Sequence, residues 1–192
     1  MKVKNIITIA IFTVLIYVLF RIVSLTALVP FLYPYVPAIT LIPCGVIWAY
    51  LRVKVPKRYG ILIQCTLLAI LTFIGGSPWF IDLGLFVGGI AAEIISGIGS
   101  YKNFKLNTFG YTVFGLIFSF GSFGVMLLAR SYYLNYVESL GMKMDHIESV
   151  LFLVTWQTFL LCCVFVVITS TIRSMLLGKR MLKKHFEKAS TV

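Results

Sequence analysis

The sequence predicts an all-α integral membrane protein with six transmembrane helices, and three observations lead to this prediction. Hydrophobic residues make up 60% of the 192-residue chain, charged residues only 12%, and the mean hydropathy is +1.00. A soluble globular domain carries about 25% charged residues, so the composition alone places the chain in a membrane. Apolar stretches also recur along the chain, and basic residues fall between and after them. We therefore expect a single membrane domain, 1–192, with a basic tail at 178–192.

The first two spans are predicted at about 5–28 and 38–53. The first follows Lys2 and Lys4, but its apolar run is longer than that of a secretory signal, which favours a retained helix. Three prolines and two tyrosines lie between the spans at 29–37, and this composition predicts a rigid loop rather than a helix. The second span ends in a strongly basic turn that contains Arg52, Lys54, Lys57 and Arg58.

The third span, about 61–74, is short for a membrane crossing. The fourth, about 78–100, organises the rest of the chain. Small residues recur along it at every fourth position: Gly84, Gly88, Ala92, Ser96 and Ser100. Such a ridge lets neighbouring backbones approach closely, which is how helices associate in lipid. This span is therefore expected inside the bundle.

Glu93 lies in the middle of that fourth span, between Gly89 and Gly97. A carboxylate facing lipid would be costly, so its side chain should face protein or water. Two interpretations remain open from the sequence, a hydrogen-bonded structural acid and a functional intramembrane group.

The fifth span is predicted at about 108–129 and is rich in glycine and phenylalanine. A polar segment, Arg130 to Ser149, follows it and contains His146. The sixth span, about 150–177, leads into the basic tail.

The distribution of positive charge predicts the orientation. With a cytoplasmic amino terminus, six spans place both termini and the basic connections inside the cell, as the positive-inside rule requires. Fourteen of the 17 Lys and Arg residues then lie inside, and three lie outside: Arg21, Arg130 and Lys143. The net charge of +11 thus reflects topology, and nucleic acid is not expected as a partner.

The predicted outer ends of the spans collect an unusual set of side chains. Aromatic residues there often anchor a helix at the membrane interface, but two outer arginines beside aromatic rings would also suit a small anionic or planar ligand. The candidate substrate-binding residues are Arg21, Tyr33, Tyr35, Trp79, Asp82, Arg130, Tyr132, Tyr133, Trp156 and Gln157.

Catalytic and metal-binding signatures are missing from the sequence. It contains no HExxH, GxSxG or Walker motif, and its histidines and carboxylates show no metal-ligand spacing. The four cysteines lie in apolar stretches and are interpreted as small apolar side chains: Cys44, Cys65, Cys162 and Cys163. We expect a protein that is not an enzyme and that has no cofactor, no metal site and no ATP site.

Several stretches carry a resemblance to a known family. They are the Pro- and Tyr-rich first loop, KVPKRYG after the second span, IAAEII around Glu93, and KKHFEKA near the end. With these features the chain resembles the Trep_Strep family over nearly its whole length. That family is grouped with the substrate-capture (S) components of energy-coupling factor (ECF) transporters.

The resemblance implies a function and partners. S components of the bacterial cell membrane bind a vitamin-like micronutrient from outside with high affinity. They then associate with a transmembrane coupling (T) protein and two cytoplasmic ATPases. The loop 29–37 would act as a lid over the outer pocket. Small residues on the first helix would meet the coupling protein, and the corresponding stripe here is Ala10, Thr13, Val14 and Tyr17.

The substrate is not specified by the sequence. Haem or another tetrapyrrole is one suggestion, based on His146, the tyrosine pairs and the outer arginines. Two alternative functions also stay open. One is a membrane-embedded enzyme that uses Glu93 or Asp82 as acid or base, and the other is a structural or regulatory membrane protein that binds no small molecule.

Overall fold

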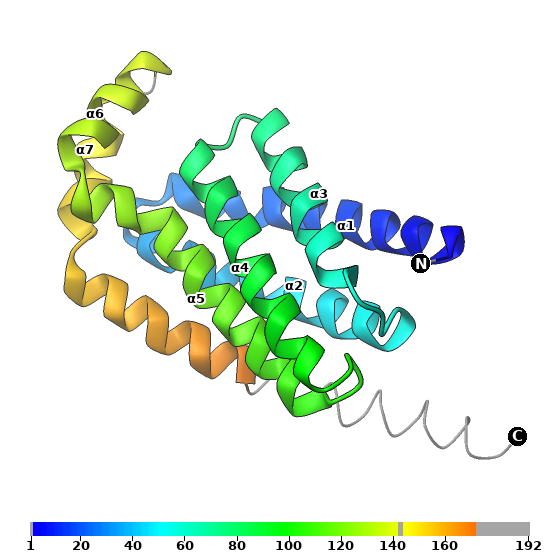
Figure 1. Cartoon of the computed structure of the whole chain (residues 1–192). Helices are drawn as coiled ribbons and strands as arrows, with labels where there is room; N and C mark the ends of the chain where they lie inside the picture. Colours follow the sequence, from blue (N-terminus) through cyan, green and yellow to red (C-terminus); the bar gives the residue numbers. More distant parts are fainter. Residues whose placement is uncertain (1, 142–143, 172–192) are drawn as a thin grey trace, which may run out of the picture.

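The computed structural model describes residues 2–141 and 144–171, and these residues form helices without any strand (Figure 1). The helices are α1 (Val3–Ser24), η1 (Leu25–Leu28), η2 (Pro30–Tyr35), α2 (Val36–Lys54), α3 (Gly60–Ile74), α4 (Trp79–Ile98), α5 (Phe104–Leu128), α6 (Arg130–Ser139), α7 (Met144–Leu153) and a final helix Trp156–Thr171. The all-α prediction is confirmed for these ranges. The basic tail predicted at 178–192 lies outside the described residues.

Four helical segments are long and apolar enough to cross a membrane: Val3–Leu28, Pro30–Lys54, Trp79–Ile98 and Phe104–Leu128. The apolar helix α3 has 15 residues, which gives a length of about 22 Å, less than a hydrocarbon core of about 30 Å. α7 and Trp156–Thr171 pass the same test only as a bent pair. The described residues therefore contain four candidate spans, or five with the bent pair, and they do not confirm the six spans predicted.

The predicted sixth span, 150–177, is not one straight helix. α7 and Trp156–Thr171 meet at an angle of 75°. The break follows from side-chain capping: the backbone N–H of Thr158 donates to the Thr155 hydroxyl, and the Thr155 N–H donates to the Thr158 hydroxyl. These reciprocal bonds satisfy backbone donors at a new helix start, so the chain turns before Trp156.

The prediction of a non-helical loop at 29–37 is wrong. Two short 3₁₀ helices, η1 and η2, occupy the connection, and α2 already begins at Val36. Pro37 lies in the first turn of α2, where the missing N–H costs nothing. Pro34 fits inside the short helix η2.

The predicted ridge of small residues on α4 forms the closest helix contact. A Cβ atom at Gly84 would lie 2.9 Å from Cα of Gly121 on α5, and one at Gly88 would lie 3.4 Å from Cα of Phe114. Gly89, on another face of α4, meets Cys65 of α3. α4 is therefore packed between α3 and α5, as Figure 1 shows, and its small residues make this possible.

The bundle has two chemically different ends. At one end, which we call the cap end, lie η1, η2, the turn 75–78, α6 and α7 (Figure 1). α7 packs against η2 there. At the other end, the basic end, lie the connections 55–59 and 99–103, which join α2 to α3 and α4 to α5.

Candidate functional site

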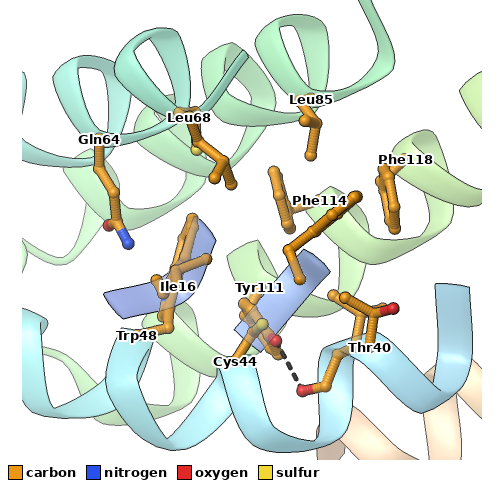
Figure 2. A pocket seen from close by; sticks show the side chains of 13 residues that line it. Ile16, Thr40, Cys44, Trp48, Gln64, Leu68, Leu85, Tyr111, Phe114 and Phe118 are labelled. Atoms are coloured by element: carbon orange, nitrogen blue, oxygen red, sulfur yellow. Dashed lines mark hydrogen bonds between the residues drawn. The ribbon is translucent and has the colours of Figure 1, made fainter. Parts of the chain in front are cut away.

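A small void lies inside the bundle and draws residues from all five of the first long helices (Figure 2). Its lining is mostly apolar and aromatic: Ile16, Phe20, Thr40, Leu41, Cys44, Trp48, Gln64, Cys65, Leu68, Leu85, Tyr111, Phe114 and Phe118. Helical spacing explains the contribution of α5, since Tyr111, Phe114 and Phe118 are three and four residues apart and share one face. The ridge of small residues on α4 packs against α5 and lets the aromatic face of α5 lie close to the other helices.

The aromatic rings along the void are arranged as stacked surfaces. Tyr111 and Phe114 stack with ring centroids 6.0 Å apart, and Phe114 and Phe118 stack at 6.3 Å. Trp48 of α2 lies 5.1 Å from the ring of Phe114. The Tyr111 hydroxyl donates a 2.8 Å hydrogen bond to the backbone carbonyl of Leu41. The resulting lining offers flat π surfaces suited to another flat ring.

Two side chains that carry N–H groups lie at one end of the void. Figure 2 shows Gln64 and Trp48 at this end and Phe118 with Thr40 at the other. Behind them, Arg52 donates a 3.0 Å hydrogen bond to Oε1 of Gln64 and lies 5.6 Å from the Trp48 ring centroid. All three side chains are buried, with exposed fractions of 1% to 4%.

Four donor atoms in this polar group have no acceptor: Trp48 Nε1, Gln64 Nε2, and Nε and Nη1 of Arg52. Each buried donor without a partner costs about 1–3 kcal/mol. All four are donors, so a group that brings hydrogen-bond acceptors would relieve the cost, whereas another donor would not. We call Trp48, Arg52 and Gln64 the donor cluster.

The cap end covers the bundle with aromatic contacts between η2 and the later helices. Tyr33 makes an edge contact with Phe123 at 6.1 Å, and Tyr35 makes one with Phe165 at 5.8 Å. The phenol of Tyr133, on α6, interacts with that of Tyr33. η2 is thus held against the bundle by its two tyrosines.

Two further candidates predicted from the sequence also meet at the cap end. Trp79, at the start of α4, donates a 3.3 Å hydrogen bond from Nε1 to the hydroxyl of Tyr132 on α6. Both side chains remain about half exposed. The structure therefore brings four of the predicted residues together in two pairs, Tyr33 with Tyr133 and Trp79 with Tyr132.

Most of the other predicted outer residues lie at the surface. Arg21, Arg130, Trp156 and Gln157 are exposed, and His146 is half-buried in α7. None of the ten predicted binding residues lines the internal void.

Asp82 is buried in the first turn of α4, where Thr72 of α3 donates a hydrogen bond to its Oδ1. Its other oxygen has no hydrogen-bond partner. The Thr72 bond links α3 and α4 near the cap end, and neither residue lines the void.

Glu93 has a structural position. Its carboxylate accepts hydrogen bonds from the backbone N–H groups of Tyr59, Ile61 and Leu62, the last two at 3.1 and 3.3 Å. These are donors of the first turn of α3, which the helix itself leaves unpaired. Glu93 on α4 therefore caps α3 from another helix, and its negative charge is favourable at a helix amino terminus.

The predicted docking stripe on α1 does not lie on one exposed face. Thr13 is buried at 1% exposure and bonds the carbonyl of Ile9, while Tyr17 packs against the core near Gly75. Ala10 is half-buried, and Val14 is exposed at 51%.

The donor cluster is not predicted by the sequence pattern. Arg52 belongs to the basic turn that indicates the cytoplasmic side, and Gln64 lies within the apolar third span. The sequence does indicate that Gln64 has a partner, because a side-chain amide in a membrane helix needs a polar group to bond. The partner, however, sits on a different helix and could not be identified from spacing.

The described residues hold no group of three or more His, Cys, Asp and Glu side chains placed to bind a metal ion. No curated protein and no solved structure matches the chain. A family model described as a hypothetical bacterial integral membrane protein (Trep_Strep) matches residues 3–188. With this match over nearly the whole length and several membrane-length apolar helices, the chain belongs to the Trep_Strep family of bacterial integral membrane proteins and is a multi-pass protein of the cell membrane.

Proposed function

We propose that this protein is the substrate-capture component of an ECF-type importer and that it binds a vitamin-like micronutrient without changing it chemically. The observation that supports this most directly is the central aromatic void, whose lining includes Trp48 and Gln64, two side chains with buried N–H groups that have no acceptor. Ligand sites are typically apolar concavities with a few polar groups that fix the orientation of the ligand. The void has this composition.

The cap end supports the proposal because η1 and η2 are short elements that join α1 to α2 there and are candidates for a lid. η2 is a short 3₁₀ helix, and it is held by the side-chain contacts of Tyr33 and Tyr35 with Phe123 and Phe165. Lids must open, so they are held by few buried contacts. We assign the lid to η1 and η2, with α6 and α7 as the surface against which it closes.

The void is much smaller than a typical ligand site. About 20 Å³ is free inside it, enough for about one water molecule, whereas ligand sites measure about 300–1,000 Å³. Binding a micronutrient therefore requires the lining helices and the lid to move apart.

The lining also defines a substrate class. A flat ring would stack between Trp48 and Phe114, and an acceptor on it would take the free N–H group of Gln64. The nearby Arg52 favours an acceptor with negative charge. We propose a planar heteroaromatic compound with a carbonyl, ring nitrogen or carboxylate. His146, which suggested a tetrapyrrole, does not line the void.

Partners follow from the same proposal. A coupling protein and two ATPases would supply energy, in a topology of six spans with both termini cytoplasmic, so that the cap end faces outward and the basic end inward. α1 is the candidate contact for the coupling protein, because its membrane segment is only 17% buried within the protein. Of the predicted stripe, Val14 and Ala10 are available for this contact while Thr13 is not.

The direct test is native mass spectrometry of the protein after incubation with a pool of vitamins. We expect the wild-type protein to retain one compound. Gln64→Leu should lose it, and the matched variant Gln157→Leu, which changes an exposed glutamine, should keep it. If Gln157→Leu or Arg130→Gln loses the compound while Gln64→Leu retains it, the site lies at the outer surface instead. A wild-type protein that folds and retains no compound from the pool contradicts the capture function.

The transport step has its own test. Association with a coupling protein should weaken in Val14→Trp, which enlarges an exposed side chain of α1, and should be unchanged in Phe152→Trp, an equally apolar exposed position on α7. If both variants associate equally well with the coupling protein, α1 is not the docking helix.

A further inference from the structure

An open pocket of about 750 Å³ lies at the basic end, on the opposite side of the bundle from the cap. Its walls come from the connection 55–59, from α3 and α4, and from the connection 99–103. It shares no lining residue with the central void. The proposed capture function does not use it.

The rim of this pocket is positively charged. Lys57, Arg58 and Lys102 line it and are exposed. The guanidinium of Arg58 lies 4.8 Å from the ring centroid of Tyr59, which holds it at the rim. Three cations converging on one concavity favour an anion with several oxygen atoms, such as a phosphate group.

Glu93 is the one acidic side chain that lines the pocket, against three basic ones, so the lining keeps a net positive charge. Its two oxygens already accept the backbone N–H groups of α3, and the residue is only 8% exposed. The carboxylate therefore belongs to the frame of the pocket.

One wall of the pocket is apolar and continues onto the outside of the bundle. Leu62, Ile90 and Ile94 line this wall, and Ile94 is 64% exposed. One turn further along α4, Ile98 is 75% exposed. In a membrane such a face contacts lipid tails. A soluble anion would leave this wall unused, whereas a lipid would use both the cationic rim and the apolar wall.

The connections that shape the pocket have an unusual backbone. Tyr59, Ser100 and Tyr101 are the non-glycine residues with positive φ among those the structure describes, and all three line the pocket. Such conformations cost energy and cluster at ligand clamps. Glu93 fixes Tyr59 through its backbone N–H, so this part of the rim is preorganised.

We propose that this pocket binds an anionic phospholipid. The phosphate lies among Lys57, Arg58 and Lys102, and one acyl chain runs along Ile90 and Ile94. Basic pockets between membrane helices commonly take such head groups. The site anchors the basic end at the membrane surface.

The test is native mass spectrometry of the full chain with phosphatidylglycerol and, separately, with phosphatidylcholine. We expect preferential retention of phosphatidylglycerol by the wild-type protein. The triple variant Lys57→Gln, Arg58→Gln, Lys102→Gln should lower this retention at least about tenfold, since each basic residue near the surface contributes to anionic-lipid binding. The matched control Lys2→Gln, Lys4→Gln, Lys105→Gln removes the same charge outside the pocket and should keep the preference.

Several outcomes would overturn the proposal. Equal loss in the two triple variants would mean diffuse attraction to the basic end, and equal retention of both lipids would mean no headgroup site. Displacement of the lipid by millimolar glycerol 3-phosphate would mean that the pocket takes a free phosphate. A second variant, Ile94→Asn, alters the apolar wall alone and should weaken retention of phosphatidylglycerol while the cations remain. Unchanged retention in that variant would also contradict the lipid assignment.

Discussion

The carboxylate of Glu93 accepts a hydrogen bond from the backbone N–H of Tyr59, thirty-four residues earlier in the chain. It thereby caps a helix to which it does not belong. Tyr59 is left-handed at φ 66° and has no side-chain oxygen in position to cap α3. Glu93 supplies that missing cap from α4.

We therefore expect Glu93→Ala to lower the free energy of unfolding by about 2–3 kcal/mol, because a buried helix start loses its acceptors. Glu93→Gln should lose less, since its single amide oxygen can still accept one or two of the three bonds. The measurement is thermal unfolding in detergent followed by helical circular dichroism. Glu148→Ala, on the exposed face of α7, is the control and should melt like the wild type. A Glu93→Ala protein that melts at the same temperature as the wild type would show that the cap contributes nothing to stability.

The ridge on α4 shows what could be predicted from the sequence. Close packing in lipid depends on small side chains at fixed helical spacing, and this spacing is visible in Gly84, Gly88 and Ala92 without knowledge of the neighbour. The identity of the neighbour, α5, required the structure. The break before Trp156 could also have been predicted, because Thr155 and Thr158 match the spacing of a helix start.

The candidate site was harder to predict for a physical reason. Aromatic and arginine residues at span ends serve equally as interface anchors and as ligand contacts, so Trp156 and Arg130 carried no decisive signal, and both are exposed in the structure. The donor cluster joins Arg52 of α2 to Gln64 of α3. Such a group depends on the rotation of two helices about their own axes, which no local pattern encodes.

The contact between Gly84 and Gly121 leads to a second prediction. A Cβ atom at Gly121 would lie 2.8 Å from Cα of Gly84, so Gly121→Ala must push α4 and α5 apart. We expect a loss of about 1–3 kcal/mol from overpacking, partly offset by the higher helix propensity of alanine. Gly124→Ala gains the same propensity but meets only the ring of Phe120, at 3.2 Å. It should be neutral or slightly stabilising, and a Gly121→Ala protein as stable as Gly124→Ala would contradict the close contact.

The hydrogen bond between Thr112 and Ser170 leads to a third prediction. The two hydroxyl oxygens are 2.8 Å apart and join α5 to the final helix. A double-mutant cycle with Thr112→Val and Ser170→Ala should give a coupling energy of about 0.6 kcal/mol, the average found for such bonds between membrane helices. In the control cycle, Thr66→Val replaces Thr112→Val. Because Thr66 bonds within its own helix, the effect of Thr66→Val should add to that of Ser170→Ala. A coupling energy as large as in the first cycle would mean that the hydrogen bond between Thr112 and Ser170 is not its source.

Tyr101 leads to the last prediction, which concerns alkaline pH. Burial, and next the hydrogen bond to Glu93, raise the pKa of Tyr101 to about 12 from its usual value of 10. A raised pKa means that the folded protein keeps this proton while the unfolded chain has already lost it. The associated stabilisation is therefore complete below pH 10 and is lost as the pH rises toward 12. Thermal unfolding temperatures measured from pH 9 to pH 12 should fall for the wild-type protein. They should fall less steeply for Tyr101→Phe, which keeps the ring and removes the titrating hydroxyl. Parallel curves for the two proteins would mean that Tyr101 does not contribute to the alkaline loss of stability.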